Sequence, residues 1–468
     1  MKQTEEIVNM NLDFLPLKSN ANIIEKNALR IDWESVCPKE KLNYIMGNPP
    51  FVGAMMTDKD QKADMQAVIG DIKGLGELDY VSAWYYKATD YINGTKIKCA
   101  FVSTNSICQG QQAVTLWKPL FEKGINIIFA YRTFRWDSEA SIKAHVHCVI
   151  VGFSFTNGSK KILYDNDQIK YVKNINSYLS EAPNIFIENH STPLCNVPPM
   201  HFGNMPRDGG GFILSPQEKE ELITRDPNTK AWIREYLGAD GFINNKKRYC
   251  LWLVGVSPST LRNSPLIIER IQHVREFRLS SKAAATRKFA ETPSLFCQIT
   301  QPPDVDYLLI PRVSSENRKY IPIGFVDSAV IASDSVLIVP NANLELFGVL
   351  TSNVHMAWMR AVCGRLKSDY RYSKDIVYNN FPWPNPTAEQ KAKIEQTAQA
   401  ILDARALYPE SSLADLYDEL TMPVELRKAH QANDKAVMQA YGFDYKTMTE
   451  SECVAELMKM YVELVKKC

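Results

Sequence analysis

The stretch YIMGNPPF, from Tyr44 to Phe51, indicates the fold class of this chain. It opens with the apolar residues Tyr44, Ile45 and Met46, and a glycine, an asparagine and two prolines follow at once. This order predicts a strand that ends in a rigid turn. Ligands of open α/β sheets usually bind outside the carboxyl ends of the strands, so we expect the turn to face a ligand.

The turn itself, Asn48 to Phe51, combines hydrogen-bond acceptors with an aromatic ring. The side-chain oxygen of Asn48 and the backbone carbonyl of Pro49 can each accept from an amine, and neither proline has an N–H that would compete. Such acceptors orient the exocyclic amine of a nucleobase, which is a poor nucleophile because its lone pair is delocalised into the ring. Pro50 would hold the loop rigid, and Phe51 would stack on a base that has flipped out of a duplex. The turn therefore predicts methylation of an amino group. The alternative interpretation is an Asn-Pro turn with Phe51 in the core.

Short apolar runs alternate with amphipathic stretches from about residue 20 to 155, which predicts an open α/β sheet. In LDYVSAWYYKATDYI, the apolar residues recur at helical spacing and predict one buried helix face. They are Leu78, Val81, Tyr85, Ala88 and Ile92. The runs GINIIFAYRTF and HVHCVIVGF are predicted to form an antiparallel pair at the edge of this sheet.

The amino-acid composition changes twice in the rest of the chain. Residues 156 to 210 are rich in Asn, Ser, Pro and Gly, which predicts a boundary or a long ordered loop. A mixed region with one long basic helical segment follows and predicts an α+β domain. After FPWPNP, strong helix formers predict a helical C-terminal module. We place the domains at residues 1–160, 161–385 and 386–468.

Composition limits the function classes without choosing among them. The chain has 468 residues, 45% of them hydrophobic and 23% charged, as expected for a globular protein of several domains. Its start lacks the pattern of a secretory signal, so we expect a cytoplasmic protein. Ten cysteines without a CxxC pair, and two histidines (His145 and His147) without a third ligand, predict no metal site. A net charge of +1 leaves DNA binding undecided.

Six strings along the chain resemble one family. They are KNALRIDW (Lys26 to Trp33), GNPPFVG (Gly47 to Gly53), AFVSTNSICQG (Ala100 to Gly110), HVHCVIVGF (His145 to Phe153), PRVSSENRKYIPIGF (Pro311 to Phe325) and CGRLKSDYRYSKDIVYNNFPWP (Cys363 to Pro384). Over nearly its whole length the chain resembles the gamma-type adenine-N6 DNA methyltransferases, and more closely the MmeI-like restriction-modification proteins. The resemblance implies an α/β fold: a partial Rossmann-like S-adenosylmethionine-dependent methyltransferase sheet, an α+β target-recognition domain and the helical module.

The same resemblance implies where a cofactor would bind. In that family the run before NPPF contacts the adenine ring of S-adenosylmethionine, at the position occupied here by Asn27, with Asp32 as a second candidate. For Asn27, a helix cap or turn role is the alternative. Gamma-type enzymes carry a glycine-containing loop and a ribose-binding acid upstream of NPPF, and the 47 residues before Asn48 contain no FxGxG-like turn after a strand. We therefore expect a chain truncated at its N-terminus, which would need an upstream methyltransferase or nuclease segment or subunit.

The second domain supplies candidate contacts to double-stranded DNA. A basic helical segment could line up cations against phosphates, or could be a solvated face; its residues are Arg270, Arg275, Arg278, Lys282, Arg287 and Lys288. Glu316 and Arg318 are candidate base readers, or two members of an ion-paired turn. Cations mixed with aromatics before VYNNFPWP predict further DNA contacts, or packing between domains; they are Arg365, Lys367 and Arg371.

These observations predict a site-specific adenine-N6 DNA methyltransferase of a restriction-modification or phage-defence system. Asn48, Pro49, Pro50 and Phe51 would form its amine pocket. One alternative is a DNA-binding remnant or subunit that cannot methylate unaided. Another is an RNA or protein-glutamine methyltransferase, since these also use Asn-Pro-Pro motifs, although the long region after residue 200 argues against it.

Overall fold

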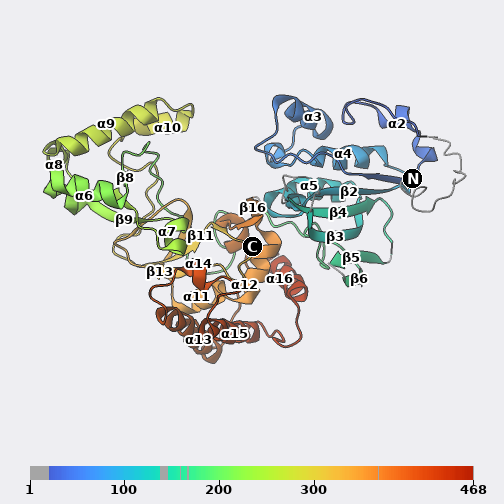
Figure 1. The fold of residues 1–468 in the computed structure, drawn as a ribbon. Helices are drawn as coiled ribbons and strands as arrows, with labels where there is room; N and C mark the ends of the chain where they lie inside the picture. The colour runs from blue at the N-terminus through green and yellow to red at the C-terminus, as the bar shows by residue number, and fades with distance from the viewer. Residues whose placement is uncertain (1–20, 137–145, 159, 166–167, 367, 467–468) are drawn as a thin grey trace, which may run out of the picture.

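The computed structural model describes residues 21–136, 146–158, 160–165, 168–366 and 368–466 (Figure 1). Its first sheet is mixed, with six strands in the order β1-β2-β4-β3-β5-β6. The strands are β1 (Tyr44–Gly47), β2 (Lys98–Thr104), β3 (Asn126–Trp136), β4 (Val146–Ser154), β5 (Lys161–Asp165) and β6 (Gln168–Val172). β1 and β2 are parallel, so their carboxyl ends lie at the same edge of the sheet.

Four α-helices accompany this sheet among the described residues up to 125. They are α2 (Trp33–Val36), α3 (Lys59–Ile69), α4 (Ser82–Tyr91) and α5 (Gly110–Glu122), and α3 packs against α4. The predicted apolar face is confirmed, because Leu78, Val81, Tyr85, Ala88 and Ile92 are all buried in one core. Tyr85 stacks on Phe153 of β4, with ring centroids 5.2 Å apart. The helix itself begins only at Ser82, so the first two of those residues belong to the turn before it.

The antiparallel pairing of the two runs after residue 124 is confirmed, since β3 pairs with β4 in antiparallel register. Their predicted place at the sheet edge is wrong. β5 pairs in parallel with β3, and β6 continues the sheet beyond β5. These two strands come from the segment that the sequence predicts to be a boundary or loop, because its polar composition hides two short amphipathic strands.

The middle of the chain is an α+β region, as predicted. Three small sheets hold its strands in the orders β14-β9-β10-β8, β13-β11-β15-β7 and β12-β17-β16. The strands are β7 (His201–Phe202), β8 (Ile213–Leu214), β9 (Ile233–Leu237), β10 (Tyr249–Leu251), β11 (Tyr307–Pro311), β12 (Val313–Ser314), β13 (Gly324–Val326), β14 (Ile331–Ala332), β15 (Val336–Pro340), β16 (Gly364–Leu366) and β17 (Asp369–Arg371). The helices are α6 (Pro216–Arg225), α7 (Ala239–Asn244), α8 (Pro258–Arg262), α9 (Pro265–Leu279), α10 (Ala284–Lys288), α11 (Leu344–Leu350) and α12 (Asn353–Val362).

The C-terminal segment is helical, as predicted from its composition. Its helices are α13 (Ala388–Ala406), α14 (Leu413–Leu416), α15 (Val424–Ala440) and α16 (Glu450–Val465). They share one hydrophobic core with β11, β15, α11 and α12. The hydrophobic core therefore continues across residue 385, where the amino-acid composition changes.

Figure 1 shows how these parts are arranged. α9 and α10 lie at one end of the molecule, α3 and α4 lie at the other end, and β16 lies between them. Among the described residues, no helix combines the length and apolar character needed to cross a bilayer.

Candidate active site

The Asn48–Phe51 turn leaves the sheet at the carboxyl end of β1, as predicted. Asn48 is exposed, Pro49 is buried and Phe51 is partly buried against the core below. In the described part of the chain, the Asn48 side chain has no hydrogen-bond partner. Its carbonyl oxygen is therefore available to accept from a ligand.

The motif is fastened to the fold at the next residue, Val52. The Val52 N–H donates to Asp79 Oδ1 at 3.0 Å, and the Val52 carbonyl accepts from the Tyr80 N–H at 3.1 Å. The other oxygen of Asp79 accepts from the Thr104 hydroxyl at 3.2 Å. Because Thr104 ends β2, the Asp79 carboxylate joins the motif loop to the neighbouring strand.

Asp79 is a residue that sequence reasoning missed. It is 2% exposed, and burial raises the pKa of its carboxyl group even though three donors hold the charged form. The available signal was an acidic residue inside the otherwise apolar run LDYV, where a carboxylate is buried at a cost.

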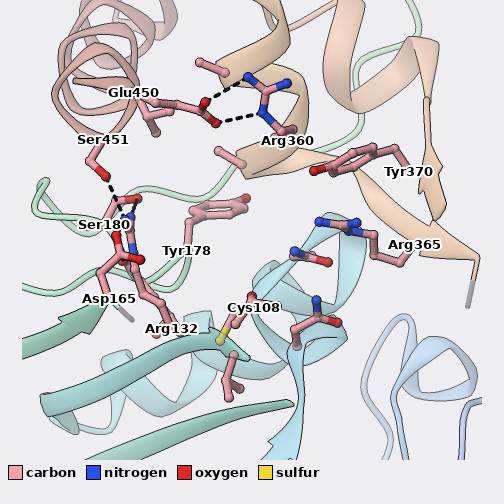
Figure 2. A pocket seen from close by; sticks show the side chains of 18 residues that line it. Cys108, Arg132, Asp165, Tyr178, Ser180, Arg360, Arg365, Tyr370, Glu450 and Ser451 are labelled. Carbon is pink, nitrogen blue, oxygen red and sulfur yellow. Dashed lines mark hydrogen bonds and ion pairs between the residues drawn. The ribbon is translucent and has the colours of Figure 1, made fainter. Parts of the chain in front are cut away.

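A cavity of about 250 Å³ lies where the sheet, the β16–β17 hairpin and α16 meet (Figure 2). Asn105, which follows Thr104 of β2 and is buried, lines this cavity. Two ion pairs close its walls: Arg132 with Asp165 at 2.9 Å and Arg360 with Glu450 at 2.8 Å. Arg132 Nη1 also donates to the hydroxyl of Ser451 in α16 at 2.7 Å, so the first sheet is joined to the C-terminal helices at this cavity.

The two candidates for a cofactor contact already have structural partners. Asn27 donates to Asp64 at 2.9 Å and accepts from the Leu29 N–H at 2.9 Å. Asp32 caps α2 by accepting from the Glu34 N–H. Asn27 remains exposed, so its second amide hydrogen can still reach a ligand.

The basic segment is split between α9 and α10, and its cations do not share one face. Arg275, Lys282, Arg287 and Lys288 are exposed, whereas Arg270 donates to the Gly211 carbonyl at 3.0 Å. Arg287 donates to the carbonyls of Ser281 and Lys282, which closes the turn between the two helices.

Arg278 contradicts its predicted role as a phosphate contact. It is 0% exposed, and its guanidinium donates to five backbone carbonyls. These belong to Pro206, Arg207, Phe289, Thr292 and Leu295. A guanidinium offers five donors, so it can satisfy carbonyls that would otherwise be buried without a partner.

Glu316 and Arg318, the two predicted base readers, lie in the turn that follows β12. Glu316 pairs with His147 of β4 at 2.7 Å, so its carboxylate joins the first sheet rather than Arg318. Arg318 is partly buried in the turn that its N–H closes on Ser315, and burial lowers its pKa.

The β16–β17 hairpin holds two more of the predicted cations. Arg365 stacks on the Tyr370 ring at 3.8 Å from its centroid and lines the cavity, as Figure 2 shows. Arg371 is exposed on β17, and Lys367 lies outside the described residues.

Within the described ranges there is no group of three His, Cys, Asp or Glu side chains that could hold a metal ion. His147 bonds to Glu316, and His145 lies outside those ranges.

Comparisons with known proteins find relatives over nearly the whole chain. Three family profiles match in sequence along the chain: the MmeI DNA-methyltransferase domain at residues 1–165, the MmeI target recognition domain at 181–385 and the MmeI C-terminal domain at 386–468. DNA methyltransferase A of Bacillus subtilis (strain 168) is 38% identical over 465 residues, which are 99% of this chain and 53% of that protein. The Type IIL restriction-modification enzyme MmeI, solved in complex with DNA, is 46% identical with a TM-score of 0.87, over 99% of this chain and 63% of that one.

The fold and these matches define a methyltransferase-type α/β domain followed by a target-recognition domain and a helical domain. The chain belongs to the MmeI-like DNA-methyltransferase family. It spans about half the length of the Bacillus subtilis relative.

Proposed function

We propose that this chain carries the amine pocket and the target-recognition part of a DNA methyltransferase that acts on adenine N6. The observation that carries this proposal is the exposed Asn48 acceptor at the carboxyl end of β1, beside a proline-rigid carbonyl and the half-buried ring of Phe51. The MmeI relative was solved in complex with DNA, which supports double-stranded DNA as the partner.

The pocket would act by orienting the amine. Asn48 Oδ1 and the Pro49 carbonyl accept its two N–H groups, so the nitrogen lone pair turns out of the base plane towards the methyl donor. As the new N–C bond forms and the methyl–sulfur bond of the donor breaks, positive charge develops on the nitrogen, and both acceptors would stabilise that charge more strongly than the neutral amine. The methylated amine then loses one proton to water, and no covalent bond to the protein is needed.

Phe51 would hold the base after it leaves the duplex. A flipped base loses its stacking neighbours, and an aromatic ring replaces part of that interaction. The Phe51 side chain already packs against the hydrophobic core of the first sheet, so it loses little conformational entropy when a nucleobase binds.

S-adenosylmethionine would supply the methyl group. We assign Asn27 as the contact for its adenine ring, with Asp32 as the second candidate. The network that links Asn27 to Asp64 fixes the orientation of the amide, which suits recognition of a ring edge.

The exposed cations of α9 and α10 would contact DNA phosphates without reading bases. They are Arg275, Lys282, Arg287 and Lys288. Glu316, Arg318, Arg365 and Arg371 are the candidates for contacts at or near the bases, since Arg suits guanine and Glu suits cytosine in the major groove. Membership of the MmeI-like family supports a role in a restriction-modification system.

A product assay tests the proposed function. The protein, alone and supplied with the upstream methyltransferase segment that the family resemblance implies, is incubated with mixed-sequence duplex DNA and S-adenosylmethionine labelled in its methyl group, and the DNA is digested to nucleosides for mass spectrometry. We expect label in N6-methyladenine only. Label in N4-methylcytosine would contradict adenine specificity, and label in RNA or protein but not DNA would contradict the substrate class.

A further inference from the structure

We propose that Asp79 is a positioning residue for the amine pocket: its buried carboxylate tethers the end of the Asn48–Phe51 motif to β2 and to the start of α4. This inference rests on the proposed function, because the motif it positions is the one that would hold the amine.

The first part of the argument is the way in which Val52 is held. Asp79 Oδ1 accepts from the Val52 N–H at 3.0 Å, and the next residue, Tyr80, donates its N–H to the Val52 carbonyl at 3.1 Å. Both backbone groups of the residue that follows Phe51 are therefore fixed by one dipeptide. The direction in which the chain leaves Phe51 is set by this pair of bonds.

The second part is what Asp79 is itself fixed to. Its Oδ1 also accepts from the Val81 N–H at 3.1 Å, and its Oδ2 accepts from the Thr104 hydroxyl at 3.2 Å. Its own N–H donates to Gln112 Oε1 of α5 at 3.0 Å. Through its carboxylate and its backbone N–H together, Asp79 thus joins the motif loop to the end of β2 and to the starts of α4 and α5, none of which belongs to the loop.

A helix-capping role explains only one of these bonds. A cap would account for the bond to the Val81 N–H at the start of α4, and capping carboxylates normally lie at the surface. Asp79 is 2% exposed, and burial raises its pKa, so the charged form is held at a cost. No lysine or arginine pairs with it among the described residues. Its acceptor capacity is used instead on the motif loop and on β2.

Small displacements of reacting groups are costly, which gives the expected effect. A shift of about 1 Å in a positioned group lowers turnover on the order of 100-fold. Asp79→Ala removes the tether and should lower kcat about 10- to 100-fold, while the Kd values for duplex DNA and for S-adenosylmethionine stay within about twofold. Asp79→Asn should recover most of kcat, because its amide oxygen can still accept from the Val52 and Val81 N–H groups.

Hydrogen exchange gives a readout that does not depend on turnover. In the unmodified protein the Val52 amide should be protected, although its neighbour Gly53 is exposed; in Asp79→Ala the peptide over residues 49–57 should exchange faster, and in Asp79→Asn it should not. Asp90→Asn is the matched control, because this exposed aspartate of α4 pairs with Lys123 at the surface. It should leave kcat and exchange unchanged.

The outcomes separate this inference from the proposed function. Methylation by the unmodified protein together with an unchanged kcat in folded Asp79→Ala would overturn the positioning role alone. If no N6-methyladenine forms even when the upstream segment is supplied, the proposed function fails, and the exchange of Val52 still decides whether the tether exists. If Asp79→Ala does not fold, Asp79→Leu fills the space without an acceptor, and an unprotected Val52 amide in the unmodified protein would overturn the tether without any variant.

Discussion

The Asn48–Phe51 loop and the α9–α10 segment are both predicted from the sequence to bind DNA or its bases. They differ in how the structure exposes the side chains on which those predictions rest. In the loop, the acceptor stands at the exposed end of a strand, where the pattern predicts it. In α9, Arg275 is exposed and Arg278, three residues later, is 0% exposed. A rigid turn therefore fixes the positions of its own hydrogen-bonding groups. Whether a long charged side chain is buried or exposed depends instead on backbone groups far away in the sequence.

The largest effect we expect comes from Arg278→Ala. The variant removes the donor from five backbone carbonyls whose hydrogen bonds are partly buried, and each buried group left unsatisfied costs about 1–3 kcal/mol, so the free energy of unfolding should fall by about 3 kcal/mol. Urea unfolding followed by tryptophan fluorescence measures it. Arg275→Ala, the matched exposed change, should stay within about 0.5 kcal/mol. Equal effects of the two variants would remove the contrast between the two arginines.

Asn48→Ala tests the loop side of the comparison. Because Asn48 is exposed and its acceptor is used most fully in the transition state, kcat should fall on the order of 100-fold, with DNA affinity and stability unchanged. Steady-state methylation and a DNA-binding titration measure the two quantities. Asn43→Ala, at the other end of the same strand, is the control and should behave like the unmodified protein. Near-normal turnover in Asn48→Ala would remove this residue from the mechanism.

Phe51→Ala should have a smaller effect, on capture of the flipped base. Loss of stacking is worth about 1–3 kcal/mol, so 2-aminopurine fluorescence at the target position should report fewer extrahelical bases at saturating protein. Phe51→Tyr keeps the ring and should restore the signal. A full signal from Phe51→Ala would indicate that the ring serves only the core beneath it.

The smallest effect should come from the exposed lysines of the basic segment. Lys282→Ala and Lys288→Ala should weaken binding to all duplex sequences alike and reduce the salt slope by about 1 each, because each lysine would release one phosphate counterion. Binding measured between low and high salt tests this. Lys428→Ala, an exposed lysine on α15, is the control. An unchanged slope would assign Lys282 and Lys288 to a solvated surface.

The sequence by itself determined the features that depend on short-range geometry. A strand followed by Gly-Asn-Pro-Pro gives an exposed acceptor at a sheet edge, because proline fixes φ and removes a donor whatever the rest of the chain does. The apolar face of LDYVSAWYYKATDYI and the helices after Pro386 follow from spacing and propensity in the same way.

Only the tertiary structure decided the features that depend on partners far along the chain. Asp79 is joined to the motif across 27 residues, and the carbonyls that bind Arg278 lie as far as 72 residues away. β5 and β6 extend the first sheet out of a polar stretch, and the C-terminal helices share their core with strands from before residue 385. The folded backbone decides which of its donors and acceptors need a side chain as hydrogen-bond partner. A local sequence pattern does not show where those backbone groups will lie.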